Sequence, residues 1–356
     1  MSKKLSLTMI VKNEMKNLSR CLNSVKDIVN EIIIVDTGSI DLTKEIASKY
    51  QAKIYDFTWN NNFAAARNFA LKHSTGDWNL VLDADEYIVD CNIGEIRKFM
   101  ELNKAIGRIK IVSNFLENGE EKQSFAFISR LFPKEVYYSG RIHEQINSKL
   151  PHYRLPFTIY HDGYLNSNEE KAQRNISILF EEYSDDPENP YILYQLAKEH
   201  KRKNDIQGAL NYLEKANRRI NKEQGFYPVF IVDYIYVLME SGHLNEGMRV
   251  IQDNEEYLND YPDFHFASGL FYMEYLIKGG LTEVSQIFSI ERAFKKCIEI
   301  GEVDKYDCVI GTGTFLAYYN LGVFYEVVGN RSEAIKYYQK SAQLDYFPAM
   351  RQLKRM

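Results

Sequence analysis

The sequence predicts an α/β domain with a mainly parallel sheet, followed by an all-helical domain. Up to residue 166, short apolar runs alternate with amphipathic stretches, which is the pattern of parallel strands connected by helices. Beyond it, a polar stretch from Glu169 to Pro190 leads into helical segments rich in Tyr and Leu. We therefore expect one domain over residues 1–166 and a second over residues 167–356.

The predicted elements of the first domain follow one another in strand–helix order. Periodicity of two and of 3.6 residues separates strands from helices, and apolar runs bounded by polar turns indicate buried strands. The expected strands are 5–11, 31–36, 52–55 and 80–82, and the expected helices are 15–25, 41–50 and 62–73. Because ligands bind at the carboxyl ends of parallel strands, polar residues that follow these strands are candidates for a site.

The most informative of these residues are Asp83 and Asp85, which follow the apolar run 80–82. If the strand continues through them, alternation places both carboxylates on the same side of the backbone. Two acids so close repel each other unless a cation or a donor lies between them, and Mg²⁺ or Mn²⁺ takes such oxygen ligands. An EF-hand is excluded because Ile88 and Gly94 occupy its required Gly and Glu positions. An aspartyl-phosphate phosphatase is disfavoured by Tyr87, where such enzymes carry Thr.

Four segments, in this order and spacing, resemble family 2 glycosyltransferases of the GT-A fold: Met9–Glu14, Val35–Ser39, Phe63–Asn68 and Leu82–Glu86. The resemblance implies a UDP-sugar donor, a divalent metal and transfer with inversion. Asp36 is then similar to a uracil or ribose contact, Arg67 to a diphosphate contact, Asp83 to a ribose or sugar contact, and Asp85 to the metal ligand. The implied nucleotide-sugar contacts are Val11, Asn13, Glu14, Asp36, Gly38, Arg67, Asp83, Ala84, Asp85 and Arg141.

Two of these roles have structural alternatives. Asp36 can cap the following helix together with Ser39 and Asp41, as Asp commonly does. Arg67 can be an exposed cation on its helix, although its planar guanidinium suits a diphosphate well.

The acceptor side of the reaction is expected in the segment 138–145, which contains Gly-Arg-Ile-His-Glu. Inverting transfer needs a carboxylate that removes the proton of the nucleophile, and Glu144 is the candidate base. The alternative is a structural pair of His143 and Glu144. Farther on, His161 stands where related enzymes complete the metal shell, and an imidazole ligand favours Mn²⁺ over Mg²⁺.

Composition limits the partners and the compartment. The net charge of −5 without a basic block disfavours nucleic acid as a partner. Four cysteines without CxxC spacing fit a reduced cytoplasm and no zinc site. No signal peptide or run of about 18 apolar residues is apparent, so we expect a cytoplasmic enzyme that is not an integral membrane protein.

The second domain carries a repeat with the small/large spacing of tetratricopeptide repeats. Residues 196–216 and 321–342 match each other, and Gly242–Gly247 echoes the turn Gly329–Ala334. A helical bundle without true repeats is the alternative. The stretch Gly311–Leu316 is not a dinucleotide fingerprint, because Leu316 replaces the third Gly and no strand is expected before it.

The combination of both domains resembles the glycocin S-glycosyltransferases of the sublancin and thurandacin type. It implies a peptide or protein acceptor with Cys or Ser/Thr as nucleophile, bound by the helical domain, which we also expect to form a homodimer. An enzyme of cell-surface polysaccharide synthesis and a non-catalytic scaffold are the alternatives. Intact Asp83, Asp85 and Glu144 argue against the scaffold.

Overall fold

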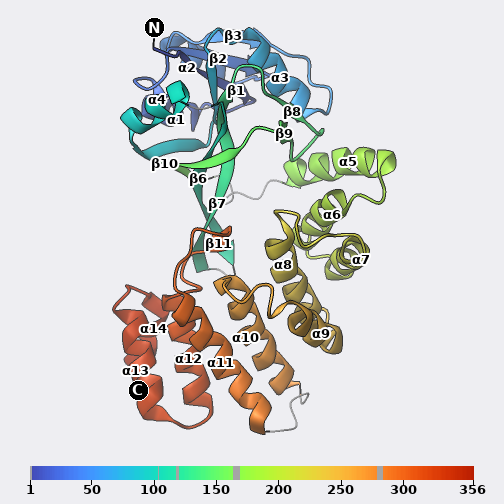
Figure 1. Cartoon of the computed structure of the whole chain (residues 1–356), viewed down its shortest axis with the longest axis vertical. Coiled ribbons are helices and arrows are strands. Elements are labelled where there is room, and N and C mark those ends of the chain that lie inside the picture. Colours follow the sequence, from blue (N-terminus) through green and yellow to red (C-terminus); the bar gives the residue numbers. More distant parts are fainter. Residues whose placement is uncertain (1, 103, 118–119, 163–168, 279–283) are drawn as a thin grey trace. The chain divides into compact units, whose positions relative to one another are not determined.

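The chain folds into two compact units, Met1–Asp185 and Asp186–Met356. The structure is a computed structural model that describes residues 2–102, 104–117, 120–162, 169–278 and 284–356 (Figure 1). Helix α5 (Glu169–Asp185) belongs to the first unit.

The first unit is built on a mixed sheet whose strand order is β3-β2-β1-β4-β7-β6-β10-β5. Strands β3, β2, β1 and β4 pair in parallel, as expected, and β7 and β6 then add antiparallel. Register places Val11 beside Asp36, so β1 and β2 end at the same edge of the sheet. The bounds are β1 Leu5–Val11, β2 Glu31–Asp36, β3 Lys53–Asp56, β4 Trp78–Val81, β5 Glu86–Cys91, β6 Ile106–Glu117, β7 Glu120–Pro133 and β10 His152–His161.

Helices cover this sheet because each carries an apolar face. In α1 (Leu18–Val25), the residues Leu18, Cys21, Leu22 and Val25 recur at helical spacing and are fully buried. Helix α3 begins after Asn62, whose side-chain oxygen accepts the Ala65 N–H at 2.8 Å. The other elements of this unit are α2 Thr43–Lys49, α3 Phe63–His73, α4 Ile93–Leu102 and the small hairpin β8 Tyr137–Ser139 with β9 Gln145–Asn147.

The second unit consists of antiparallel helix pairs, which confirms the tetratricopeptide-like prediction (Figure 1). Small residues let paired helices approach, since a Cβ on Gly322 of α12 would lie 2.5 Å from the ring of Tyr338 on α13. The pairs are α6 Pro190–Arg202 with α7 Ile206–Asn217, α8 Tyr227–Glu240 with α9 Leu244–Asn254, α10 Pro262–Ile277 with α11 Val284–Ile300, and α12 Phe315–Val327 with α13 Arg331–Ala342.

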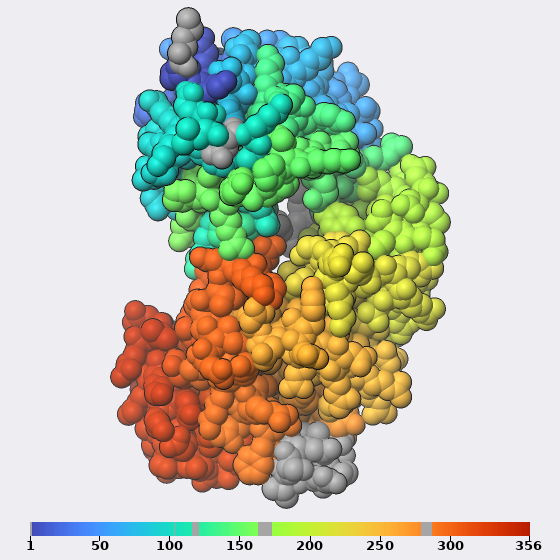
Figure 2. Space-filling model, viewed as in Figure 1, coloured from blue at the N-terminus to red at the C-terminus, as the bar shows by residue number. Residues whose placement is uncertain are grey.

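Helix α14 (Phe347–Leu353) packs on α13 and ends the helical unit, and both appear in red in Figure 2. Its Phe347 is 63% exposed, whereas Leu353 packs against the buried cluster around Tyr338. Within the described part of the chain, no helix is both long enough and apolar enough to cross a membrane.

One expectation about the second unit is wrong. A two-residue strand, β11 (Cys308–Val309), does precede the stretch Gly311–Leu316. Two carboxylates hold the loop that follows: Glu302 accepts the Gly311 N–H at 3.0 Å, and Asp263 accepts the Val309 N–H at 2.8 Å. The glycines therefore shape a turn before α12.

Asp263, at the start of α10, is buried at the centre of this arrangement. The hydroxyl oxygen of Thr312 lies 2.5 Å from Asp263 Oδ1 and 2.9 Å from the carbonyl oxygen of Val309. A hydroxyl has one proton, so both contacts are satisfied when protonated Asp263 donates to Thr312 and Thr312 donates to Val309. Burial accordingly raises the pKa of Asp263 to about 7.

This geometry predicts that the stability of the helical unit depends on pH. Because the folded state holds the Asp263 proton more tightly than the unfolded chain, its contribution is full below the ordinary pKa of 3.8 and is lost as pH rises to about 7. Asp263→Asn keeps a donor for Thr312 and should flatten this decline. Urea unfolding of both proteins at about pH 5 and about pH 8 measures the difference. Equal pH dependence in the two proteins would contradict the assignment.

Candidate active site

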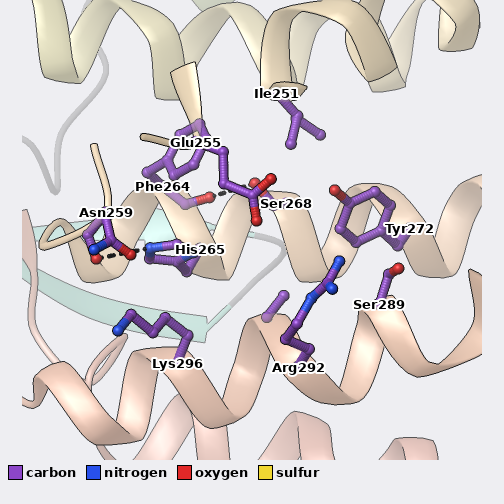
Figure 3. Close-up of a pocket in the computed structure, with 11 residues that line it drawn as sticks. Ile251, Glu255, Asn259, Phe264, His265, Ser268, Tyr272, Ser289, Arg292 and Lys296 are labelled. Carbon is purple, nitrogen blue, oxygen red and sulfur yellow. Dashed lines mark hydrogen bonds between the residues drawn. The ribbon is translucent and has the colours of Figure 1, made fainter. Parts of the chain in front are cut away.

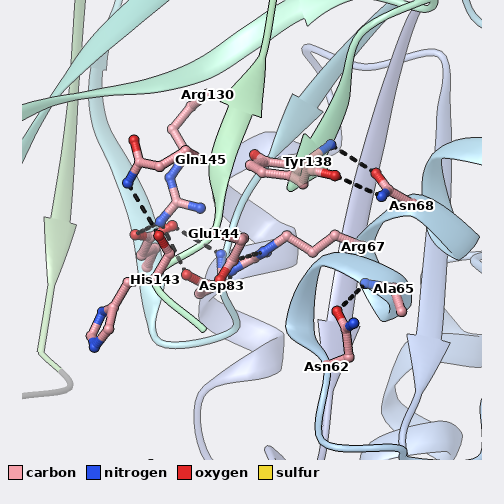
Figure 4. Close-up of polar contacts among 11 residues, drawn as sticks. Asn62, Ala65, Arg67, Asn68, Asp83, Arg130, Tyr138, His143, Glu144 and Gln145 are labelled. Atoms are coloured by element: carbon pink, nitrogen blue, oxygen red, sulfur yellow. Dashed lines mark hydrogen bonds and ion pairs between the residues drawn. The ribbon is translucent and has the colours of Figure 1, made fainter. Parts of the chain in front are cut away.

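Two arginines hold Asp83 from opposite sides (Figure 4). Arg67 on α3 donates from Nη2 to Asp83 Oδ1 at 2.9 Å, and Arg130 on β7 donates from Nη2 to Oδ2 at 3.0 Å. Burial would raise the pKa of Asp83, but the two guanidinium charges hold it well below its usual range. The cations that compensate this acid are therefore side chains of the protein.

Glu144 binds the same arginine. The Nε of Arg67 donates to Glu144 Oε1, so one guanidinium joins the candidate base to the first acid of the Asp-x-Asp segment (Figure 4). Arg67 is only 9% exposed, which excludes the exposed-cation alternative, and its Nη1 makes no hydrogen bond to any described residue. The neighbouring Asn68 exchanges hydrogen bonds with the backbone of Tyr138 at 2.8 and 2.9 Å and so anchors α3 to β8.

Asp85 contacts a different partner. Its Oδ2 lies 3.4 Å from Nε2 of His161, the last residue of β10. Burial alone would lower the pKa of His161, but the hydrogen bond and charge of Asp85 raise it. Among the described residues, no three His, Cys, Asp or Glu side chains gather in one place as a metal centre made by protein side chains alone would have them. Asp85 and His161 form a pair.

The alternation argument for Asp83 and Asp85 is therefore wrong. Strand β4 ends at Val81, and residues 84–85 form a turn before β5, so strand periodicity does not apply there. The two carboxylates contact different groups, one the arginines and the other His161.

Asp36 lies at the end of β2 and is 1% exposed. Its Oδ1 accepts the N–H groups of Gly38 at 2.9 Å and Ser39 at 2.8 Å, so this oxygen does close the turn in the manner of a cap. Its Oδ2 is buried and accepts no hydrogen bond from the described residues. A buried carboxylate oxygen without a donor is costly, and this one can accept a hydrogen bond from a ligand.

The loop after β1 is tied to the loop after β2. The Asn13 N–H donates to Ser39 Oγ at 2.9 Å, and the Ile40 N–H donates to Asn13 Oδ1 at 2.9 Å. Asn13 adopts φ 56°, and Gly38 adopts φ 105°, which favours glycine. Val11, which is buried, ends β1, and the side chain of Glu14 accepts from Asn17 at 3.0 Å. The residues that the sequence predicts to contact the nucleotide thus lie together where β1 and β2 end.

Two other residues that were predicted to contact the nucleotide sugar, Ala84 and Arg141, lie outside this group of loops. Ala84 is buried in the turn between Asp83 and Asp85, so it can offer a ligand only its backbone. The guanidinium of Arg141 lies 3.4 Å from Glu181 and 3.7 Å from Asp185, both on α5. The nucleotide role that the resemblance implies for Arg141 therefore has no geometric support.

Sequence reasoning missed Arg130 and Glu86. The Nη2 of Arg130 lies 2.5 Å from Glu86 Oε1, and Glu86 Oε2 accepts the Asp83 N–H at 2.9 Å. Burial raises the pKa of Glu86, although the charge of Arg130 opposes this effect. A signal was available, because Arg130 precedes Leu131 and Phe132 in an apolar strand, and a buried arginine needs a carboxylate partner.

The helical unit contains a separate pocket of about 180 Å³ among α9, α10 and α11 (Figure 3). Polar residues at helical spacing on α10 and α11 line it. His265 contacts the carbonyl oxygen of Asn259 at 3.1 Å, and Ser268 donates to the Phe264 carbonyl at 2.8 Å. The polar residues around it are Glu255, Asn259, His265, Ser268, Tyr272, Ser289, Arg292 and Lys296.

Comparison with known proteins identifies the family. Residues 6–166 match the family model described as glycosyl transferase family 2. The chain is 30% identical over 292 residues to the SPbeta prophage-derived glycosyltransferase SunS of Bacillus subtilis, covering 78% of this chain and 68% of that protein. It is 33% identical over 230 residues to a TPR repeat-containing protein of Synechococcus elongatus, covering 59% and 55% of the two chains.

Among solved structures, the crystal structure of MamA matches with a TM-score of 0.39 and 18% identity, covering 53% of this chain and 94% of that one. The extent of the match to SunS, together with the family model that matches within the first unit, establishes the family of this chain. The chain belongs to glycosyl transferase family 2, and it is a glycosyltransferase.

Proposed function

We propose that this glycosyltransferase moves a sugar from a UDP-sugar to a peptide or protein acceptor, with inversion at the anomeric carbon. The observation that carries the proposal is the guanidinium of Arg67, which binds both Asp83 and Glu144. A donor-side carboxylate and an acceptor-side carboxylate that share one arginine flank a single reaction site.

Asp36 is the proposed contact for the nucleoside. Its buried Oδ2 lacks a donor, and the uracil N3–H or a ribose hydroxyl can supply one. The parallel strands β1 and β2 end beside it, and the carboxyl edge of such strands is where open α/β sheets bind nucleotides.

Asp85 and His161 are the proposed protein ligands of Mn²⁺ or Mg²⁺. Their oxygen and nitrogen are 3.4 Å apart, close to the roughly 3 Å that separates neighbouring ligands bound at about 2.1 Å to one ion. Such an ion, completed by diphosphate oxygens and water, would stabilise the charge that develops on the leaving UDP. The donor set therefore fits a divalent cation, and the imidazole favours Mn²⁺.

Glu144 is the proposed base. As the acceptor oxygen or sulfur forms its bond to the anomeric carbon, the bond from that carbon to the UDP oxygen breaks, and the proton of the nucleophile passes to the Glu144 carboxylate. Arg67 orients this carboxylate, and its third nitrogen, Nη1, has no partner among the described residues. An N–H group of Nη1 can therefore donate a hydrogen bond to an oxygen of the UDP-sugar.

A direct assay tests the function as a whole. The full chain is incubated with Mn²⁺, a panel of UDP-sugars, and matched peptides that contain Cys, Ser or Thr, and UDP release and peptide mass are followed. With at least one donor, we expect the peptide mass to increase by one residue of the sugar that this donor carries. UDP release without any peptide product would mean that the sugar passes to water, which rejects these peptides as acceptors and favours an acceptor of another class, such as a polysaccharide. Neither donor binding nor UDP release would favour the scaffold alternative.

The helical unit is the proposed acceptor-binding part, because tetratricopeptide-like stacks present extended surfaces for peptides. A chain ending at Asp185 keeps α5 and its contacts to Arg141, and it should bind UDP like the full chain but transfer poorly to a peptide. Calorimetry with UDP and the peptide assay separate the two effects. Unchanged peptide transfer by the shortened chain would contradict an acceptor role.

A homodimer through the helical unit remains part of the proposal. Phe347 on α14 and Val327 at the end of α12 expose 63% and 73% of their surface, and large apolar side chains so exposed can pack against a second copy of the chain. Light scattering of the full chain, compared with Phe347→Asp, tests the pairing. A monomeric wild-type protein would end this part of the proposal.

A further inference from the structure

A chain of alternating charges extends beyond the residues already assigned to the reaction. In order it contains Glu144, Arg67, Asp83, Arg130 and Glu86, and each neighbouring pair is in direct contact. The first three residues have proposed roles at the donor or the acceptor. Arg130 and Glu86 have none, although both are buried, at 7% and 3% exposure.

Arg130 is placed to control the orientation of Asp83. One nitrogen, Nη2, bridges Asp83 Oδ2 at 3.0 Å and Glu86 Oε1 at 2.5 Å, while Glu86 Oε2 accepts the backbone N–H of Asp83 at 2.9 Å. Arg130 and Glu86 therefore hold both the side chain and the backbone of Asp83. Arg130 lies on the central strand β7 at a register shift, where the adjacent Ser129 and Leu131 pair with β6, so it approaches Asp83 from a strand that the sheet supports on both sides.

The opposite oxygen of Asp83 is held by Arg67, which also orients Glu144. If Arg130 is removed, Oδ2 of Asp83 loses its partner, and the carboxylate is free to rotate toward Arg67. Such a rotation would disturb the contact of Arg67 with Glu144 as well. A displacement of about 1 Å at a reacting group can lower a rate by on the order of a hundredfold.

We propose, resting on the proposed function, that Arg130 is a positioning residue for sugar transfer: it sets Asp83 for the donor and, through Arg67, sets Glu144 for the acceptor. It acts through its contacts with Asp83 and Glu86. Its contribution should appear in donor binding and in turnover together, because both carboxylates depend on the same chain of contacts.

The test must distinguish two roles of Arg130: positioning Asp83 and Glu144, or only neutralising the buried charge of Glu86. Arg130→Met leaves Glu86 buried without its cation, which is expected to destabilise the fold. The double variant Glu86→Gln with Arg130→Met removes both charges, and the Gln oxygen can still accept the Asp83 N–H. Arg108→Met is the matched control, since it removes an arginine from the neighbouring strand β6 whose guanidinium donates to the backbone oxygen of Phe127.

We expect the double variant to unfold near the wild-type temperature, yet to bind UDP with Mn²⁺ about tenfold more weakly and to turn over about a hundredfold more slowly. Arg108→Met should match the wild type in both. Wild-type binding and turnover in the double variant would overturn the role of Arg130. A wild-type enzyme that neither binds nor releases UDP would instead reject the proposed function, so the two failures are distinguishable.

Discussion

Glu144→Gln should retain UDP binding and lose transfer by on the order of a hundredfold or more, the usual contribution of a positioned base. The amide keeps the size of the side chain and can still accept a hydrogen bond from Arg67, but it cannot take a proton at the moment of attack. Transfer to the peptide acceptor is measured under single-turnover conditions, and UDP binding is measured by calorimetry.

Two comparisons make this experiment specific. Glu135→Gln removes a surface carboxylate that pairs with Lys104 at 3.0 Å, and it should leave transfer unchanged. A thiol acceptor needs less help from a base, because a thiolate is appreciably available near neutral pH, so the loss should be smaller for a Cys peptide than for its Ser counterpart. A parallel fall of UDP affinity and rate would place Glu144 in the donor site instead.

The parallel part of the fold is predictable from the sequence because its signals are local. Apolar runs that end at Val11 and Asp36 are strands in the structure, and the two ends lie side by side in register. The helical pairs are equally local, since Ala209 and Gly322 mark positions where helices approach closely. Helix bounds differ by a few residues at turns, where capping decides the start.

The antiparallel half of the sheet is not predictable in the same way. Strand β7 follows β6 in the chain and pairs with it locally, but its other neighbour, β4, is far away in the sequence, and no local pattern encodes the pairing of β4 with β7. Arg130 enters the site through this pairing. Its contact with Asp83 therefore becomes visible only when the tertiary structure is known.

The Asp-x-Asp segment shows the same limit at the scale of single residues. Strand periodicity holds up to Val81 but fails at the turn over residues 84–85, so Asp83 and Asp85 diverge toward different partners. The sequence indicates that compensating cations are needed. Arginines meet this need at Asp83, and the proposed divalent ion would meet it at Asp85.

Because Asp85 stands apart from the arginines, Asp85→Asn should abolish metal-dependent transfer while leaving the fold intact. Its side chain is 21% exposed and pairs only with His161 among the described residues, so the change removes a charged ligand without stranding a buried arginine. We expect a loss of at least about a hundredfold in UDP release with saturating Mn²⁺. The unfolding temperature should stay close to that of the wild type.

Asp162→Asn provides the matched control, because this neighbouring carboxylate pairs with Arg20 at 2.7 Å. It should retain the metal response. His161→Asn should lower the preference for Mn²⁺ over Mg²⁺ more than it lowers the maximal rate, since an amide oxygen replaces the imidazole that favours Mn²⁺. Full activity of Asp85→Asn, or of the wild type in excess chelator, would remove the metal from the proposal. Arg67 and Arg130, the two arginines that contact Asp83, would then be the main source of positive charge near the UDP-sugar.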